Sequence, residues 1–188
     1  MDEKALVQRA QQGDIDAFNQ LVLQYQRVAF SVAYRILGNQ DRAMDATQDA
    51  FLRGYRALSR FRGGSFKSWI LRIVTNCCYD RLRAQKRRPT SAIDDMIEDD
   101  EHSDLLTDHS ESAQAHLERQ DVAQALRQAL SELPDDQRMV VVLSDIEGLS
   151  YDEIATTLSI NLGTVKSRLS RARAKLRDHI RAHQELFA

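Results

Sequence analysis

The chain has 188 residues, 43% of them hydrophobic and 6% aromatic, and its formal net charge of −2 is too small to indicate a partner. Seven glycines and two prolines are few for this length, which suits one large or two small domains and favours an all-α protein. The first nine residues are polar and charged, and no apolar run approaches the ~20 residues of a membrane span, so we expect neither a signal peptide nor a membrane protein.

Apolar residues recur at spacings of three and four from Ala5 to Ile36, which predicts helical structure up to Gly38-Asn39. Asp41 is the expected cap of the next helix, which runs to about Leu58. One stripe of this helix is expected to face the core: Met44, Thr47, Phe51, Tyr55 and Leu58. The opposite stripe suits docking onto another helix, although spacing alone favours a plain solvated face: Asp45, Gln48, Asp49, Leu52 and Arg56.

Residues 61–88 contain the single tryptophan of the chain, interleaved with aromatic and basic residues. Gly63-Gly64 predicts a loop, and a helix follows from about Lys67 to Lys86. One helix face carries Arg72, Asn76, Tyr79 and Arg83, and the other carries Ile70, Val74 and Cys77. Aromatic rings stack on unpaired bases at ~1–3 kcal/mol each while cations follow phosphates, so this pattern favours single-stranded DNA binding. The alternative is that Trp69 and the phenylalanines are core residues and Asn76 is a local cap.

Charge is distributed along the chain in three blocks. Residues 53–88 hold eleven basic side chains and one acid, residues 89–118 hold ten acids and no base, and residues 163–181 hold seven basic side chains and one acid. Two basic patches joined by an acidic tether fit a protein that contacts a polyanion at two places, although charged helix faces can also be merely solvated. The acidic composition of residues 89–114 predicts a mobile linker. Three histidines spaced seven apart lie in it or just after it, and we expect them to be solvated rather than to bind a metal: His102, His109 and His116.

The only cysteines, Cys77 and Cys78, are neighbours in sequence, and adjacent cysteines rarely form a disulfide. They fit a reduced, cytoplasmic protein, with Cys77 packed as a small hydrophobic residue.

A second helical domain is expected from about Ala115. Its first apolar stripe comprises Leu117, Val122, Leu126, Leu130 and Leu133, and Pro134-Asp135 starts a further helix through Leu143. Ser150 and Glu153 then form a capping box, residues 159–162 a short connection, and Gly163-Thr164 the start of a second helix. This order is typical of a helix-turn-helix.

The second helix of that motif is amphipathic. Its core stripe is expected to be Val165, Leu169, Ala172 and Leu176. Its outer face has Ser167, Ser170, Arg171 and Ala174, flanked by Lys166 and Arg168. Small polar residues with long cations suit entry into the DNA major groove, although an ordinary basic surface helix would carry the same residue types.

Three segments together resemble the extracytoplasmic-function group of the sigma-70 family of RNA polymerase sigma factors. They are DATQDAFLRGYRAL (45–58), FRGGSFKSWILRIVTNCCYDRLR (61–83) and LPDDQRMVVVLSDIEGLSYDEIATTLSINLGTVKSRLSRARAKL (133–176). The resemblance implies an all-α protein of two small helical domains, a region 2 bundle at residues 1–88 and a region 4 helix-turn-helix at residues 115–188, with the acidic linker at residues 89–114. The family's usual turn glycine and proline are Ser159 and Asn161 here, and we expect the turn to persist because Asn tolerates turn geometry.

The resemblance also implies partners and site residues. Core RNA polymerase would be bound by Asp45, Gln48, Asp49, Phe51 and Leu52. The −10 promoter element would be bound by Phe61, Phe66, Lys67, Trp69, Arg72, Asn76, Tyr79 and Arg83. The −35 element would be bound by Thr164, Lys166, Ser167, Arg168, Ser170 and Arg171. An anti-sigma factor is an expected further partner, whereas a catalytic group, a metal, a cofactor and a small-molecule substrate are not expected.

Two other classes of protein remain as alternatives. A free-standing helix-turn-helix regulator would explain the C-terminal domain but would leave the segments around Asp45 and Trp69 without a role. A DNA enzyme with a helix-turn-helix tail would need a nucleophile or metal-binding acids, and we find no Gly-rich phosphate loop and no zinc spacing.

Overall fold

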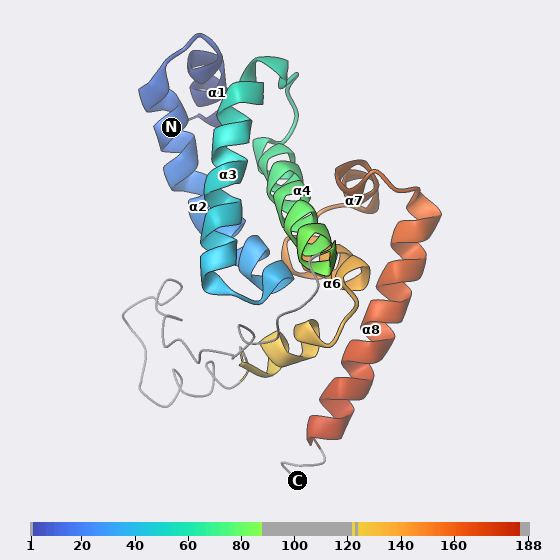
Figure 1. Ribbon diagram of the computed structural model, residues 1–188. Helices are drawn as coiled ribbons and strands as arrows, with labels where there is room; N and C mark the ends of the chain where they lie inside the picture. The colour runs from blue at the N-terminus through green and yellow to red at the C-terminus, as the bar shows by residue number, and fades with distance from the viewer. Residues whose placement is uncertain (1, 88–121, 123, 185–188) are drawn as a thin grey trace, which may run out of the picture.

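The computed structural model describes residues 2–87, 122 and 124–184, which form helices and contain no β-strand, as the all-α prediction requires. An N-terminal group comprises α1 (Glu3–Gln11), α2 (Ile15–Leu37), α3 (Gln40–Ala57), the 3₁₀-helix η1 (Leu58–Arg60) and α4 (Phe66–Arg87). A C-terminal group comprises helical residues 124–131, α6 (Asp135–Val141), the π-helical η3 (Val142–Ile146), α7 (Tyr151–Leu158) and α8 (Leu162–Gln184) (Figure 1).

The predicted linker at residues 89–114, its histidines and the expected start of the second domain at Ala115 lie outside the described residues. Among the helices that the structure describes, none combines the length and apolar composition that crossing a bilayer requires.

Side-chain caps set the helix boundaries of the N-terminal group. The sequence did not predict a break between α1 and α2, where Asp14 caps α2 by accepting a hydrogen bond from Ala17 N at 3.0 Å. The predicted cap at Asp41 is wrong. Asn39 is the cap of α3, since its backbone is extended and its Oδ1 accepts from Arg42 N at 2.9 Å. Asp41 lies in the first turn, where its charge is favourable beside the helix dipole.

Helix α4 packs its apolar face against α2 and α3. The predicted buried residues Ile70, Val74 and Cys77 are confirmed, at 0 to 1% exposure. Gly54 permits the close approach of α3, because a Cβ there would stand 3.0 Å from Ile70 Cδ1. Burial raises the pKa of Cys78 to about 12, which keeps this thiol in its protonated, unreactive form.

The C-terminal group is built around α8. The predicted core stripe is confirmed, because Val165, Leu169 and Ala172 are buried and Leu176 packs against them. The helix begins at Leu162, slightly before the predicted Gly163-Thr164, because Asn161 Oδ1 accepts from Thr164 N at 2.7 Å and so provides the cap. The predicted capping box of Ser150 and Glu153 is present at the start of α7.

The apolar stripe predicted before Pro134 is only half correct. Leu130 and Leu133 are buried at 2% and 3%, but Val122 and Leu126 are 68% and 40% exposed. Periodicity identifies an apolar face but does not show whether another element covers it.

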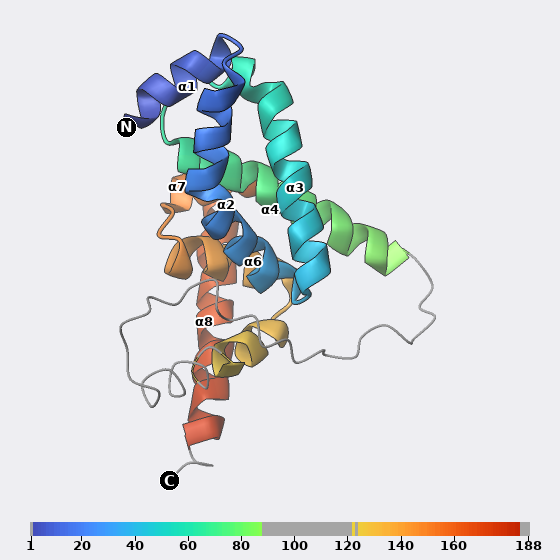
Figure 2. The ribbon, with the colours of Figure 1, turned by 90° about the vertical axis from the view of Figure 1, so that its left-hand side faces the viewer.

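The two groups pack against each other, and their buried side chains form one continuous hydrophobic cluster. Helix α7 lies beside the first turns of α4, and α6 and η3 contact α2 (Figure 2). Arg138 of α6 ties the groups together, since its guanidinium donates to Ile36 O of α2 at 2.7 Å and to Leu130 O at 2.8 Å. Carbonyls at helix C-termini lack intrahelical partners, and Arg138 satisfies several of them.

The turn of the helix-turn-helix contains a strained residue, which gives a stability prediction. Ser159 has a left-handed backbone with φ of 53°, where a Cβ is unfavourable. We expect Ser159→Gly to stabilise the fold by ~0.5–1 kcal/mol and to raise the Tm by about 1–4 °C, measured by circular dichroism at 222 nm. The control Gly148→Ser places a side chain at φ of 73° and should lower the Tm. An unchanged or lower Tm in Ser159→Gly would show that the turn carries no such strain.

Candidate nucleic-acid and protein interfaces

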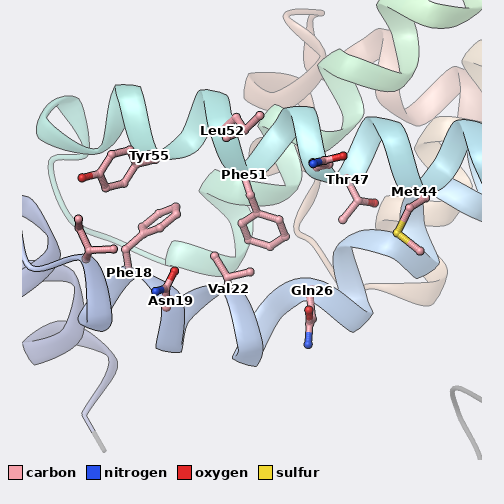
Figure 3. A pocket seen from close by; sticks show the side chains of 11 residues that line it. Phe18, Asn19, Val22, Gln26, Met44, Thr47, Phe51, Leu52 and Tyr55 are labelled. Atoms are coloured by element: carbon pink, nitrogen blue, oxygen red, sulfur yellow. The ribbon is translucent and has the colours of Figure 1, made fainter.

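An open, mostly apolar groove runs between α2 and α3 (Figure 3). Apolar periodicity predicted Met44 and Tyr55 to be core residues, and this prediction is wrong, because they are 52% and 43% exposed and line this groove. The two helices leave room between their facing side chains. The lining residues are Ile15, Phe18, Asn19, Val22, Gln26, Met44, Thr47, Gln48, Phe51, Leu52 and Tyr55.

Three of the five residues predicted to bind core polymerase line this groove. Gln48, Phe51 and Leu52 line it, with Leu52 52% exposed and Phe51 nearly buried at its floor. Asp45 and Asp49 lie on the same helix and both pair with Arg81 of α4, at 3.5 and 2.7 Å. Asp45 and Asp49 are therefore not lining residues, but they lie on the helix that forms one wall, where Arg81 pairs with both carboxylates. The apolar walls suit the apolar face of an amphipathic helix.

Sequence reasoning missed the contribution of α2. Ile15 is 59% exposed, and Phe18 and Val22 lie opposite Phe51 across the groove. Ile15 and Val22 belong to an ordinary amphipathic pattern, so periodicity alone could not distinguish groove-lining residues from core residues.

The loop before α4 rests on an aromatic cluster. The ring centroids of Phe61 and Trp69 are 5.3 Å apart, and those of Phe66 and Trp69 are 5.4 Å apart. Phe66 is fully buried, whereas Phe61 and Trp69 are half-buried. Gln11 of α1 donates to Phe61 O at 2.8 Å and so fixes the loop from outside. Phe66 is therefore a core residue beneath the loop, whereas the side chains of Phe61 and Trp69 are partly accessible to solvent.

The outer face of α4 carries the other predicted −10 residues. Arg72, Asn76, Tyr79 and Arg83 are all exposed on one side of the helix, as the helical wheel predicted. The guanidinium of Arg83 lies 5.7 Å from the centre of the Tyr79 ring, which orients both side chains. Lys67 does not share this exposure, because its ammonium lies against the C-terminal group, 3.2 Å from Glu147 Oε2.

Most of the residues predicted to bind the −35 element are exposed on the outer face of α8. Lys166, Ser167, Ser170 and Arg171 are exposed. Thr164 is half-buried and takes part in the helix cap, since its hydroxyl donates to Asn161 Oδ1 at 2.8 Å. Arg168 pairs with Asp136 of α6 at 3.0 Å.

Arg173, a second cation of the C-terminal basic block, also has an acidic partner. Arg173 forms a two-pronged contact with Asp145 of η3, with its Nε at 2.9 Å from Oδ2 and its Nη2 at 2.6 Å from Oδ1. The Arg173 guanidinium holds the pKa of Asp145 below its usual range. This contact joins the middle of α8 to η3. Sequence reasoning could not identify it, because the two residues are 28 positions apart.

Within the part of the chain that the structure describes, no three His, Cys, Asp or Glu side chains are grouped so that they could hold a metal ion.

The chain is similar to known proteins over nearly its whole length. Residues 21–88 match the family described as Sigma-70 region 2, and residues 123–176 match the family described as Sigma-70, region 4. The RNA polymerase sigma-H factor of Pseudomonas aeruginosa is 39% identical over 174 residues, 91% of this chain and 90% of that protein. The ECF RNA polymerase sigma-E factor of Escherichia coli K12 is 39% identical over 176 residues, 92% and 91% of the two chains.

Two solved structures share the fold. One is CnrH in complex with the cytosolic domain of CnrY, with a TM-score of 0.67, 28% identity and coverage of 96% of this chain and 99% of that one. The other is the sigma factor RpoE in complex with the anti-sigma factor NepR from Bartonella quintana, with a TM-score of 0.65, 25% identity and coverage of 87% and 96%.

The Arg173–Asp145 contact predicts a pH-dependent stability difference. Because both side chains are partly exposed, we expect Arg173→Gln to cost about 0.5–1 kcal/mol at pH 7. The folded pKa of Asp145 is lowered, so the stabilisation is complete above the ordinary aspartate pKa and is lost as pH falls through the lower folded value. Urea unfolding at pH 7 and pH 3 should show the difference from wild type shrinking at pH 3.

The exposed neighbour Lys175 offers a matched control, since Lys175→Gln removes a cation from the same helix and should cost little at either pH. An equal cost for the two variants would contradict the role given to Arg173.

Proposed function

The chain belongs to the sigma-70 family of RNA polymerase sigma factors, in its extracytoplasmic-function subfamily, and we propose which of its surfaces carry out each step of promoter-specific initiation. The observation that carries the proposal is that one chain exposes an apolar groove and two separate cationic helix faces. A sigma factor needs these three surfaces, whereas a free-standing DNA-binding regulator needs only one reading helix.

The α2–α3 groove binds core RNA polymerase. Its apolar walls supply buried area, and Asp45 and Asp49 on α3 supply charge that selects a basic partner helix. Arg81 holds these two carboxylates in place at 3.5 and 2.7 Å, so the acidic pair is organised before the polymerase arrives.

The outer face of α4 binds the melted −10 element. Arg72 and Arg83 follow the phosphates, Asn76 can form hydrogen bonds with a base edge, and Tyr79 offers a ring for stacking. The Phe61–Trp69 edge lies at the start of the same helix and can line a pocket for a base taken out of the stack. Unstacking a base costs a few kcal/mol, which these contacts offset.

The outer face of α8 reads the −35 element in the major groove. Lys166 and Arg171 are exposed near the N-terminal half of the helix, where the helix dipole also favours phosphates. Ser167 and Ser170 are short enough to let the helix approach the bases. Arg168 pairs with Asp136 of α6, so it must leave this partner in order to contact DNA. If it keeps Asp136, it holds α8 in place while Arg171 contacts the bases.

The chain supplies binding and strand capture, and the polymerase performs the chemistry, so no enzymatic activity is assigned to it. Its place of action is the cytoplasm, where the polymerase and the chromosome are. An anti-sigma factor is its proposed inhibitor, by likeness to the sigma factor RpoE that was solved with NepR.

Run-off transcription with purified core polymerase and a pool of genomic promoter fragments tests this function. Transcripts that depend on the added protein and share two sequence elements upstream of their starts are the expected result. Binding to core without initiation would contradict promoter-directed initiation, and failure to bind core would return the chain to the class of free-standing regulators.

A substitution in the groove tests the polymerase-binding assignment. Leu52→Glu places a charge on an apolar wall and should raise the Kd for core polymerase by at least about tenfold, or ~1.4 kcal/mol, measured by fluorescence anisotropy of the labelled protein. Leu23→Glu is the matched control, because Leu23 is 66% exposed on α2 and is not among the groove-lining residues. Equal weakening by both variants would place the binding surface elsewhere.

A substitution on α4 tests the −10 assignment. Asn76→Ala should lower discrimination among −10 sequences by about 1–3 kcal/mol at one base position, as expected for the loss of a base-edge contact, and should leave the −35 preference unchanged. Arg171→Ala should do the reverse. Run-off assays on templates randomised in each element separate the two effects. Uniform loss of transcription in both variants, without a change in preference, would show that neither side chain reads sequence.

A further inference from the structure

The loop that precedes α4 turns on two glycines and has little packing of its own. Gly63 and Gly64 have φ of 95° and 91°, and a Cβ on either would meet no atom within 4 Å. At the end of the loop Phe66 is fully buried, whereas Phe61 at its start is only half-buried. The position of Phe61, whose ring contacts Trp69, therefore depends on contacts from outside the loop.

Helix α1 provides such a contact through Gln11, its last residue. Gln11 Nε2 donates to Leu58 O at 3.0 Å and to Phe61 O at 2.8 Å. These two carbonyls lie at the two ends of η1, where the chain leaves α3 for the loop. Because both partners are acceptors, only the NH₂ end of the amide can bond to both, and this fixes its orientation. One side chain, 47 and 50 positions earlier in the sequence, thus holds both ends of η1.

Helix α1 is itself held on the N-terminal group. Its apolar face is buried, with Leu6, Val7 and Ala10 at 3 to 6% exposure. Arg9 pairs with Asp14, the cap of α2, at 2.7 Å. Figure 2 shows α1 lying across the end of the N-terminal group at which α3 gives way to the loop. The anchoring matters because a hydrogen bond can position a loop only if its donor is fixed.

A second contact runs from α1 to the aromatic cluster beneath the loop. The Tyr25 hydroxyl donates to Glu3 Oε2, and the centroid of the Tyr25 ring is 5.4 Å from that of Phe66. Burial and the bond to Glu3 raise the pKa of Tyr25, so its hydroxyl keeps the proton that it donates. Phe66 in turn contacts the Trp69 ring at 5.4 Å. Helix α1 therefore supports both the backbone and the rings of this region.

We propose that α1 is a positioning element for −10 recognition, in which Gln11 holds η1 and the loop so that Phe61 and Trp69 are ordered before a base arrives. This role rests on the −10 function proposed for the loop and deepens it by naming the residue that fixes the loop. Gln11 acts through the loop rather than on the DNA. It lowers the cost of binding, since side chains that are ordered in advance need not be immobilised when the strand binds.

The fluorescence of Trp69 tests the hold of Gln11 on the loop, because Trp69 is the single tryptophan of the chain. Gln11→Met keeps the length of the side chain but removes the donor, so it should shift the emission to longer wavelength and increase quenching by acrylamide. Gln8→Met is the matched control, since Gln8 is exposed one turn earlier on α1, and should change neither. Equal effects of the two substitutions, or no effect of Gln11→Met, would overturn this hold.

Binding of the −10 strand separates positioning from a general loss of stability. The probe is a labelled single-stranded oligonucleotide that carries the −10 element found by run-off transcription. Holoenzyme assembled with Gln11→Met should bind it about fivefold more weakly than wild-type holoenzyme, the cost of ordering one or two side chains on binding. The Kd for core polymerase should not change, because the residues that line the polymerase groove belong to α2 and α3. Equal weakening of both affinities would overturn the positioning role.

Restoring a donor provides a further comparison. Gln11→Lys places an ammonium near the same two carbonyls, so it should recover the wild-type emission and tighten binding relative to Gln11→Met. The gain should exceed that of Gln8→Lys over Gln8→Met, which measures the effect of an added charge alone. Equal gains at the two positions would contradict a role for the hydrogen bonds.

Arg83→Ala tests the −10 role independently of α1, because it removes a cation from the outer face of α4 and should weaken binding of the same oligonucleotide. Weaker binding in Arg83→Ala with unchanged binding in Gln11→Met would overturn the positioning role and leave the −10 role intact. Unchanged binding in both variants would contradict the −10 role, and the positioning role with it.

Discussion

The rest of the structure depends on how helix α4 is held by the elements around it. Its apolar face is buried against α2 and α3, its two ends are held by acids of the C-terminal group, and its cationic outer face remains exposed. The burial of Ile70, Val74 and Cys77 fixes the rotation of the helix about its axis, and the rotation determines that Asn76 and Arg72 face outward. A helix cannot present a reading face unless another face is anchored.

The same logic applies to α8 with different chemistry. Its apolar stripe anchors one face, Asn161 fixes where it begins, and the Arg173–Asp145 contact joins it to η3. Basic side chains therefore have two roles in this protein. Some, such as Lys166 and Arg171, are exposed and are proposed to contact DNA, whereas others, such as Arg173, join the helix that carries them to a neighbouring element.

The sequence could predict features that arise within one helix. Apolar spacing predicted the buried faces of α4 and α8, and the Ser150–Glu153 pattern predicted the capping box, because these depend only on neighbouring residues. It failed for Met44 and Tyr55, since whether an apolar stripe becomes core or groove depends on how closely a second helix approaches.

Contacts between distant segments could not be predicted at all. Lys67 and Glu147 are 80 positions apart, and nothing in either neighbourhood indicates the other. The hydrogen bond from Arg138 to Ile36 O likewise joins residues that are 102 positions apart, and the sequence near one does not indicate the other. These long-range contacts are also the ones that join the C-terminal group to α2 and α4, so the packing of the two groups was not visible in the sequence.

The central claim is that the outer face of α4 contacts the −10 strand because the opposite face of the helix is anchored on α2 and α3. A photo-cross-linking amino acid introduced in place of the exposed Arg72 tests this contact most directly. In the initiating complex with core polymerase and promoter, the cross-link should map to the −10 element. A cross-link confined to protein while transcription proceeds would contradict the account.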